Sequence, residues 1–169
     1  YGSDLGMGIT AENVAEKYNI SREDQDVFSV ESQRKADVAI KEGKFKEEIT
    51  PIEVKMKKKS VLFEQDEFPR PDTTLEKLSA LKPVFKKDGT VTAGNACGRN
   101  DGAAAVLVMT AQKANELNLT PMARVVDWAA VGVSPEIMGI GPVPAVQKLL
   151  ERTGKTIDEI DLFELNEAF

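Results

Sequence analysis

Polar and apolar positions in the first quarter of the chain recur with the period of an α-helix. Thr10 can cap a short helix over residues 11–18, and Asn19 can end it. Ser21 begins a second cap, and the helix that follows should run up to Gly43, which stops it. Apolar residues share one stripe of this second helix and predict a packed face: Phe28, Ala36, Ala39 and Ile40.

The next part of the chain has the pattern of a small hairpin and a short helix. Residues 49–56 mix apolar and charged side chains and predict a strand, with residues 61–63 as its partner across a Lys-rich turn. A short helix should follow over residues 75–81. Its cap is one of three neighbouring residues: Asp72, Thr73 or Thr74.

From residue 103 onward the pattern changes to alternating strands and helices, which is typical of α/β proteins. Residues 103–109 are small and then branched apolar, which suits a strand buried on both faces. Further elements are predicted in this order: a helix over 111–117, a strand over 123–131, a loop over 134–141, a helix from Pro142 to Gly154 and a strand over 161–165. In the helix after Pro142 the buried stripe should be Val143, Val146, Leu149 and Leu150.

Residues 90–102 lie at the junction of these two regions and are rich in Gly, Asn and Asp. Such residues tolerate tight turns and let a loop approach a ligand closely. The loop leads directly into the strand predicted over 103–109, and binding loops are often mounted on a rigid strand in this way. A purely structural loop fits the same pattern equally well.

Composition narrows the function classes. Hydrophobic residues make up 41% and charged residues 30% of 169 residues, which is typical of a globular protein. The net charge of −6 argues against general nucleic-acid binding. No apolar run approaches the roughly 20 residues that a membrane-spanning helix needs, so we expect neither nucleic acid nor membrane as a partner.

Missing residue types exclude several catalytic centres within this chain. The sequence contains no His, so neither a Ser-His-Asp triad nor a Cys-His pair can form from it, and the usual zinc ligand sets are excluded as well; we expect no metal site. One Cys, Cys97, fits a reducing compartment and predicts a cytoplasmic location. The chain starts at Tyr1 and stops at Phe169, directly after a predicted strand, so we expect an internal piece of a larger protein.

Several residues are candidates for chemistry, each with a plain structural alternative. Asn166 follows a predicted strand, where ligand crevices form in α/β sheets, but it could equally cap a following helix. Cys97 could be a nucleophile or a buried inert thiol. The lysines at 55 and 57–59 could attract a phosphorylated ligand or form a solvated turn. Arg70 lies between two prolines and could face a ligand or be a plain surface residue. Met138 lies in a Gly-rich loop and could line a ligand channel or fill a gap in the core.

Four sequence blocks, in order, closely resemble the thiolase family. The first is Gly8-Ile9-Thr10-Ala11-Glu12-Asn13-Val14-Ala15, and the second is Ser21-Arg22-Glu23-Asp24-Gln25-Asp26. The third runs from Val91 to Ala104 and contains Gly94-Asn95-Ala96-Cys97-Gly98-Arg99-Asn100-Asp101-Gly102. The fourth combines Met138-Gly139-Ile140-Gly141-Pro142 with the terminal Asn166-Glu167-Ala168-Phe169. Together they cover almost the whole chain.

The resemblance implies a fold and a domain division. The expected class is α/β: part of a thiolase-like fold, in which a mixed sheet is layered with helices and carries an inserted α+β loop domain. Residues 1–99 would be the loop domain that binds coenzyme A. Residues 100–120 would end the N-terminal thiolase domain, and residues 121–169 would begin the C-terminal one.

The resemblance also implies an activity. Thiolases join two acetyl-CoA molecules into acetoacetyl-CoA, or cleave 3-ketoacyl-CoA, through an acyl-cysteine. Neither the nucleophilic Cys nor the catalytic His falls within this chain, so the segment should be inactive alone. Coenzyme A or acetyl-CoA would be a substrate, with no covalently bound cofactor, and the parent should be a homo-oligomer, a dimer or tetramer.

Site residues follow from the same resemblance. Asn166 maps to the asparagine that holds the oxyanion-hole water. Arg70 maps beside the adenine of coenzyme A. Further positions map to the pantetheine channel: Met7, Phe85, Ala93, Cys97, Met138, Ala168 and Phe169.

Departures from the family pattern put three contacts in doubt. Cys97 stands where the family usually has Ser, and a thiol is the weaker hydrogen-bonding group. Gly6 replaces a common His, and Lys77 replaces a common Ser. Two other classes remain open. One is a thiolase-like protein that binds acyl-CoA without chemistry, against which the terminal block at Asn166 argues, and the other is a condensing enzyme acting on carrier-protein thioesters, against which the long loop domain with its basic turn argues.

Overall fold

The structure is a computed structural model, and the residues that it describes are 5–57 and 59–169. The chain forms two compact units, which are described separately. Unit 1 consists of Tyr1–Gly98 together with Glu167–Phe169, and unit 2 is Arg99–Asn166. Within the described residues, no helix is both long enough and apolar enough to cross a membrane.

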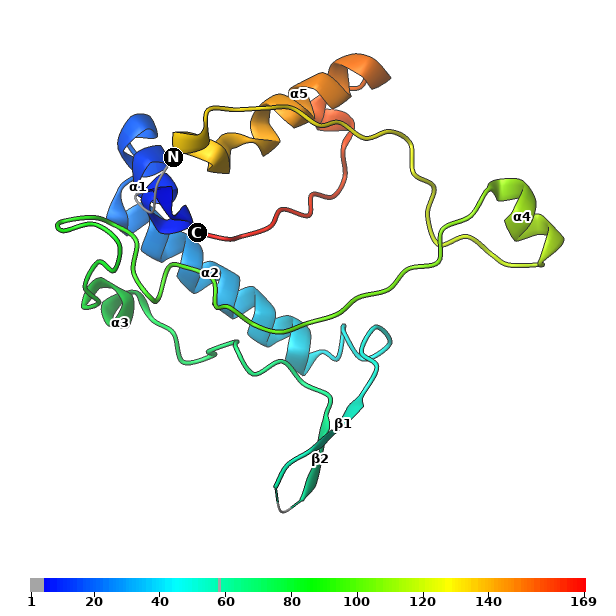
Figure 1. Ribbon diagram of the computed structural model, residues 1–169, viewed down its shortest axis with the longest axis horizontal. Helices are drawn as coiled ribbons and strands as arrows, with labels where there is room; N and C mark the ends of the chain where they lie inside the picture. Colours follow the sequence, from blue (N-terminus) through cyan, green and yellow to red (C-terminus); the bar gives the residue numbers. More distant parts are fainter. Residues whose placement is uncertain (1–4, 58) are drawn as a thin grey trace. The chain divides into compact units, whose positions relative to one another are not determined.

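Two helices begin unit 1 (Figure 1): α1 spans Met7–Tyr18 and α2 spans Arg22–Lys41. Gly6, not Thr10, is the N-cap of α1, so this helix begins earlier than predicted. Thr10 lies inside the helix, where its hydroxyl donates to the Met7 carbonyl at 2.8 Å; a Thr can satisfy itself in this way without capping. Asn19 ends α1 in the left-handed conformation, with φ 54°, as predicted.

The start of α2 has the predicted capping box. The Ser21 hydroxyl accepts a hydrogen bond from the Asp24 amide at 3.0 Å, and the Ser21 amide donates to the Asp24 carboxylate. The Ser21 hydroxyl also donates to the Asp24 carboxylate at 2.6 Å, and this bond, together with the one from the Ser21 amide, lowers the pKa of Asp24 below its ordinary value. The predicted apolar stripe is only partly correct: Phe28 is 59% exposed, and the fully buried residue of α2 is Asp26. The reason is that this face of α2 packs against a polar loop, described below.

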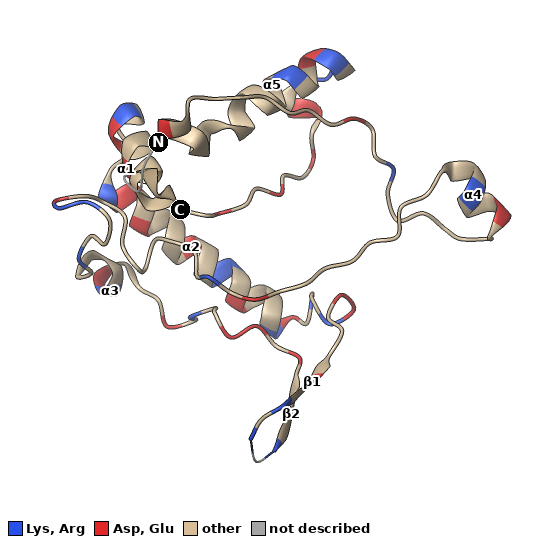
Figure 2. Ribbon diagram, in the orientation of Figure 1, with Lys and Arg blue, Asp and Glu red and all other residues tan. Residues whose placement is uncertain are grey.

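A two-stranded antiparallel hairpin follows α2. Strand β1 spans Ile52–Lys55 and β2 spans Ser60–Phe63, with Ile52 opposite Phe63. All residues of both strands are exposed. Figure 2 shows basic residues at the turn, where Lys57 and Lys59 are exposed and Lys58 lies outside the described residues.

Helix α3, Leu75–Ser79, packs against α2. Thr74 is the cap, because its hydroxyl accepts from the Lys77 amide at 3.2 Å. Arg22 joins the two helices: its Nη2 donates to the carbonyl of Leu78 at 2.5 Å and to that of Leu81 at 3.2 Å. Leu78 is 5% exposed and is among the few buried apolar residues.

Unit 2 contains two α-helices and two 3-10 helices among its described residues. Helix α4 spans Ala111–Glu116 and is capped by Thr110, and α5 spans Pro142–Thr153 and ends at Gly154 with φ 67°. The prediction of a loop over 134–141 was wrong, because Pro135–Ile140 forms the 3-10 helix η2; a second one, η3, spans Ile157–Glu159. The predicted buried stripe of α5 is not buried, and Val143 is 57% exposed.

The strands predicted in unit 2 are extended chain rather than strands in this structure. Across the residues described, the sheet consists of β1 and β2. Val106, Leu107 and Val108 are 87%, 80% and 76% exposed, so the prediction of a buried strand over 103–109 was wrong for this chain. A strand needs a neighbour to complete its hydrogen bonds, and these segments have none in the described structure.

Gly8 allows a close contact in unit 1. A Cβ at Gly8 would lie 2.2 Å from Cγ of Phe85, so the ring rests directly on the helix backbone. The Phe85 ring also meets Phe169 edge-on, with centroids 6.0 Å apart.

We expect Gly8→Val to lower the free energy of unfolding by about 1–3 kcal/mol, because the added side chain must displace the Phe85 ring. The control is Gly102→Val, since a Cβ at Gly102 meets no atom within 4 Å. Urea unfolding followed by far-ultraviolet circular dichroism measures both. Equal losses in the two variants would contradict the close contact.

Candidate functional site

Glu12 holds the start of the Gly-rich loop. Its carboxylate is 3% exposed and accepts from the amides of Thr90 and Val91, both at 2.8 Å, and from the Thr90 hydroxyl at 2.9 Å. The loop must approach closely for this: a Cβ at Gly89 would lie 2.3 Å from a Glu12 oxygen. A buried carboxylate therefore sets the backbone path of residues 89–91 through charge-assisted hydrogen bonds.

Asn95 and Asp26 hold the centre of the same loop. The Asn95 amide nitrogen donates to Asp26 Oδ1 at 2.9 Å and to the Thr90 carbonyl at 3.0 Å, and its oxygen accepts from the Thr92 amide at 2.7 Å. Asp26, 1% exposed, is paired with Arg22 at 2.8 Å. The fully buried residues of unit 1 are thus largely polar. The Asn95–Asp26 bond fixes the loop to α2, whereas the bonds of Asn95 to Thr90 and Thr92 brace the loop internally.

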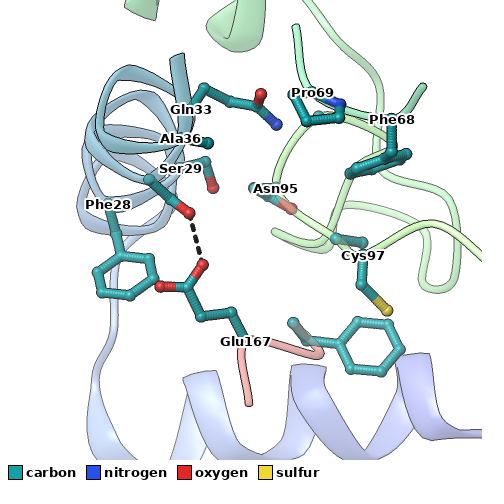
Figure 3. Close-up of a pocket in the computed structure, with 13 residues that line it drawn as sticks. Phe28, Ser29, Gln33, Ala36, Phe68, Pro69, Asn95, Cys97 and Glu167 are labelled. Atoms are coloured by element: carbon teal, nitrogen blue, oxygen red, sulfur yellow. Dashed lines mark hydrogen bonds between the residues drawn. The ribbon is translucent and has the colours of Figure 1, made fainter. Parts of the chain in front are cut away.

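A cavity of about 220 Å³ lies between α2 and this loop (Figure 3). Phe28, Ser32 and Gln33 come from α2, Phe68 and Pro69 from the segment before α3, and residues 94–97 from the loop. Glu167 and Phe169 close the lining from the end of the chain. The Cys97 side chain is exposed and lies on this wall.

The last residues of the chain are attached to unit 1 at three places. The Cys97 amide donates to the Ala168 carbonyl at 3.1 Å, and the Ser32 hydroxyl donates to Glu167 Oε2 at 2.5 Å. Phe169 makes the ring contact with Phe85 described above. In Figure 1 the C-terminus accordingly lies beside α1 and α2.

The structure brings several of the predicted site residues together. Cys97 and Phe169 line the cavity, and Ala168 and Phe85 contact them. Met7 is the residue before Gly8, on which the Phe85 ring rests, and it is 50% exposed.

Other predicted residues lie further from the cavity wall. Ala93 is exposed on the loop, and Arg70 is exposed next to Pro69, with its amide donating to the Gln33 side chain at 2.6 Å. Met138, 45% exposed, and Asn166, exposed, belong to unit 2. Their roles stay predictions.

Two exposed ion pairs lie on the surface of unit 1. Lys77 donates to the Asp72 carboxylate at 2.6 Å, which lowers the pKa of Asp72, so the lysine at this unusual position is already paired. The Lys86 ammonium donates to Glu16 at 2.8 Å, which lowers the pKa of Glu16 and raises that of Lys86. Among the described residues, no group of three or more His, Cys, Asp or Glu is arranged to hold a metal ion.

Sequence reasoning missed the residues that hold the loop and the chain end: Glu12, Asp26, Asn95, Ser32 and Glu167. One signal was available for Glu12. Gly8, Glu12 and Ala15 are spaced by four and three positions and share one helix face, and all three are buried. An acidic residue between two small ones on a single face indicates a close polar contact.

Comparisons with known proteins agree with the resemblance seen in the sequence. The families "Thiolase, N-terminal domain" and "Thiolase, C-terminal domain" match residues 2–112 and 119–169. An acetyl-CoA acetyltransferase of Pseudomonas aeruginosa is 55% identical over 99% of this chain. A probable acetyl-CoA acyltransferase of Staphylococcus epidermidis is also 55% identical over 99% of the chain. The chain spans 43% of the length of both relatives.

Solved structures give the fold class. The crystal structure of the Bacillus anthracis acetyl-CoA acetyltransferase matches with a TM-score of 0.94 and 51% identity, over 96% of this chain and 41% of that one. Human mitochondrial 3-ketoacyl-CoA thiolase matches with a TM-score of 0.92 and 50% identity over the same shares. The predicted α/β, thiolase-like fold class is confirmed, and the chain belongs to the thiolase family.

Proposed function

We propose that this chain is the coenzyme A-binding segment of an acyl-CoA C-acetyltransferase. The complete enzyme cleaves acetoacetyl-CoA with coenzyme A, or condenses two acetyl-CoA molecules into acetoacetyl-CoA and free coenzyme A. This chain supplies binding surface and the oxyanion-hole asparagine, Asn166. The nucleophilic cysteine and the catalytic histidine come from polypeptide outside these 169 residues, because the chain has no His and its one Cys lies on the loop.

The observation that carries this proposal is the convergence of predicted substrate positions in unit 1. The Cys97 amide is hydrogen-bonded to the Ala168 carbonyl, and the Phe85 ring contacts the Phe169 ring. Cys97 and Phe169 also line one cavity. These four positions come from segments far apart in the sequence, and the family resemblance alone singles them out. The names of the relatives at 55% identity support the same reaction class.

Each residue has a proposed part in holding the substrate. The apolar side chains of Met7, Phe85 and Met138 suit the pantetheine arm, and Ala93 leaves room beside it. Arg70 lies at the adenine end, where an exposed guanidinium can stack on a base or bond a phosphate. Coenzyme A is a substrate here, and no covalently bound cofactor is needed.

Asn166 acts on the reacting thioester. Its amide holds a water that, with the histidine from outside the chain, donates to the thioester oxygen as negative charge develops there. Such a donor stabilises the transition state more than the ground state, so it accelerates the chemical step.

A second candidate is a thiolase-like protein that binds acyl-CoA without chemistry. The departures at Cys97 and Gly6 weaken the proposed contacts to coenzyme A in either candidate. The terminal block Asn166-Glu167-Ala168-Phe169 counts against the second candidate, because a protein that only binds acyl-CoA does not need an oxyanion-hole donor. A side chain at Gly6 would meet no atom within 4 Å, so the fold itself does not require glycine there.

Assays of acetoacetyl-CoA cleavage with the chain alone and with the full-length polypeptide that carries it test the proposal. We expect turnover only from the full-length polypeptide, since the bond-making groups lie outside the chain. Coenzyme A binding without turnover by the full-length polypeptide would favour the second candidate. Robust turnover by the 169-residue chain alone would contradict the proposal.

Location and assembly complete the proposal. We place the complete enzyme in the cytoplasm, in keeping with the one cysteine of this chain. We also propose a homo-oligomer, a dimer or tetramer, in which acyl-CoA is the small-molecule partner. The division into a loop domain over 1–99 and parts of two thiolase domains over 100–120 and 121–169 belongs to the same proposal.

A further inference from the structure

One hydrogen bond joins α2 to the far end of the chain. The Ser32 hydroxyl donates to Glu167 Oε2 at 2.5 Å, across 135 positions of sequence. The dashed line in Figure 3 marks this bond at the edge of the cavity. Because the acceptor is a carboxylate, the bond is of the stronger, charge-assisted kind.

We propose that Ser32 is a positioning residue that holds the segment 166–169 in its working place by binding Glu167. The inference rests on the proposed function, in which Asn166 directly precedes Glu167 and serves the oxyanion hole. Ser32 also lines the cavity, but its hydroxyl donates to Glu167, and in this scheme its role is to hold that residue. It acts through the carboxylate of Glu167.

The contacts of the segment favour Ser32 over the other attachments. The bond from the Cys97 amide uses backbone atoms and holds Ala168, and the ring contact holds Phe169. The Ser32 bond holds Glu167, the residue next to Asn166 in the chain. It is also the attachment that is lost when one side-chain oxygen atom, the hydroxyl oxygen of Ser32, is removed.

The hydroxyl of Ser32 differs from those of other helical serines in unit 1. Ser29, one turn earlier, donates to the Gln25 carbonyl of its own helix at 2.8 Å. Ser79 of α3 likewise donates to its own helix, at the Glu76 carbonyl, at 3.0 Å. The hydroxyl of Ser32 instead reaches a residue of another segment, so removing it loosens a tertiary attachment.

This placement predicts a particular kinetic signature. An oxyanion donor must be held within a fraction of an ångström to act on the transition state. Loosening the segment should therefore lower kcat. The KM for the coenzyme A thioester should stay nearly unchanged, because the surfaces around Arg70 and Phe85 remain in place.

The test compares Ser32→Ala with Ser32→Thr, which keeps a hydroxyl, and with the matched control Ser79→Ala. In the 169-residue chain, amide exchange at Cys97 is measured by NMR, since that amide bonds Ala168 and reports whether the segment is attached. We expect exchange about three- to tenfold faster in Ser32→Ala than in the control. In the full-length polypeptide, Ser32→Ala should lower kcat for acetoacetyl-CoA cleavage about tenfold and leave KM unchanged. Ser32→Thr should retain most of the unsubstituted kcat.

Each outcome decides the matter. Equal Cys97 exchange in Ser32→Ala and Ser79→Ala would overturn the attachment. Faster Cys97 exchange in Ser32→Ala with an unchanged kcat would overturn the positioning role. A change of kcat and KM together in this variant would overturn it as well. If the unsubstituted full-length polypeptide shows no turnover, the proposed function fails, while the exchange measurement still decides whether Ser32 holds the segment.

Discussion

Replacing Asn166 with Ala in the full-length polypeptide is expected to lower kcat for acetoacetyl-CoA cleavage about 100- to 1,000-fold, the usual effect of removing one oxyanion-hole donor. In the proposed mechanism the Asn166 amide holds the water that donates to the developing oxyanion, and the methyl group of Ala cannot hold this water. KM should change little, because the contact gains strength only in the transition state. Steady-state kinetics with acetoacetyl-CoA and coenzyme A measure both constants.

The matched control for Asn166 is Asn115→Ala. Asn115 is an exposed asparagine within α4, in the same unit, and alanine is a good helix former. We expect its kcat to equal that of the unsubstituted enzyme. A loss of less than threefold in Asn166→Ala, or an equal loss in both variants, would remove Asn166 from the mechanism.

Glu12→Ala is expected to destabilise unit 1 by about 2–5 kcal/mol. The substitution leaves the buried amide of Val91 and the part-buried amide of Thr90 without an acceptor, and each unsatisfied buried donor costs about 1–3 kcal/mol. Residues 89–97 should then lose their fixed path, so Cys97 and Ala93 would no longer be held. Urea unfolding and amide exchange of residues 90–97 measure the two effects.

Glu16→Ala is the control for Glu12. Glu16 lies one turn further along α1, with its side chain 72% exposed, and pairs with Lys86 on the surface. An exposed pair of this kind contributes little to stability, so this variant should unfold close to the unsubstituted chain. Equal destabilisation by the two variants would show that the buried bonds of Glu12 do not hold the loop.

Local signals in the sequence correctly predicted several helix ends. Ser21 caps α2, Thr110 caps α4, and Asn19 and Gly154 end their helices, because capping bonds and left-handed residues involve only near neighbours. The prediction for Thr10 was wrong for a related reason. The hydroxyl of a threonine near a helix start can cap the helix, or it can donate to a backbone carbonyl one turn earlier. Thr10 does the second, because Gly6 is already the N-cap of α1.

Strand predictions failed where the chain lacked a partner. Residues 103–109 have the composition of a buried strand, yet Val106 is 87% exposed. Composition expresses a preference, whereas a strand also requires hydrogen bonds and burial from other segments. The hairpin of β1 and β2 formed because its two strands are close in sequence and pair with each other.

In the candidate site too, some residues were identified from the sequence and others only from the structure. Motif resemblance alone selected the loop around Cys97, the position of Phe85 and the terminal segment with Ala168 and Phe169. It gave no role to Glu12 and Asp26, although both lie in the matching blocks, and it did not include Ser32; all three stabilise those positions from helices that are distant in sequence.

The sequence by itself determined the family, the helix boundaries marked by caps and glycines, and the residues proposed to meet coenzyme A. Only the tertiary structure decided which buried carboxylates hold the loop and which serine binds the end of the chain. The physical reason is that caps and turns depend on neighbours a few residues away, whereas a buried carboxylate is stable only where folding brings donors from distant segments to it.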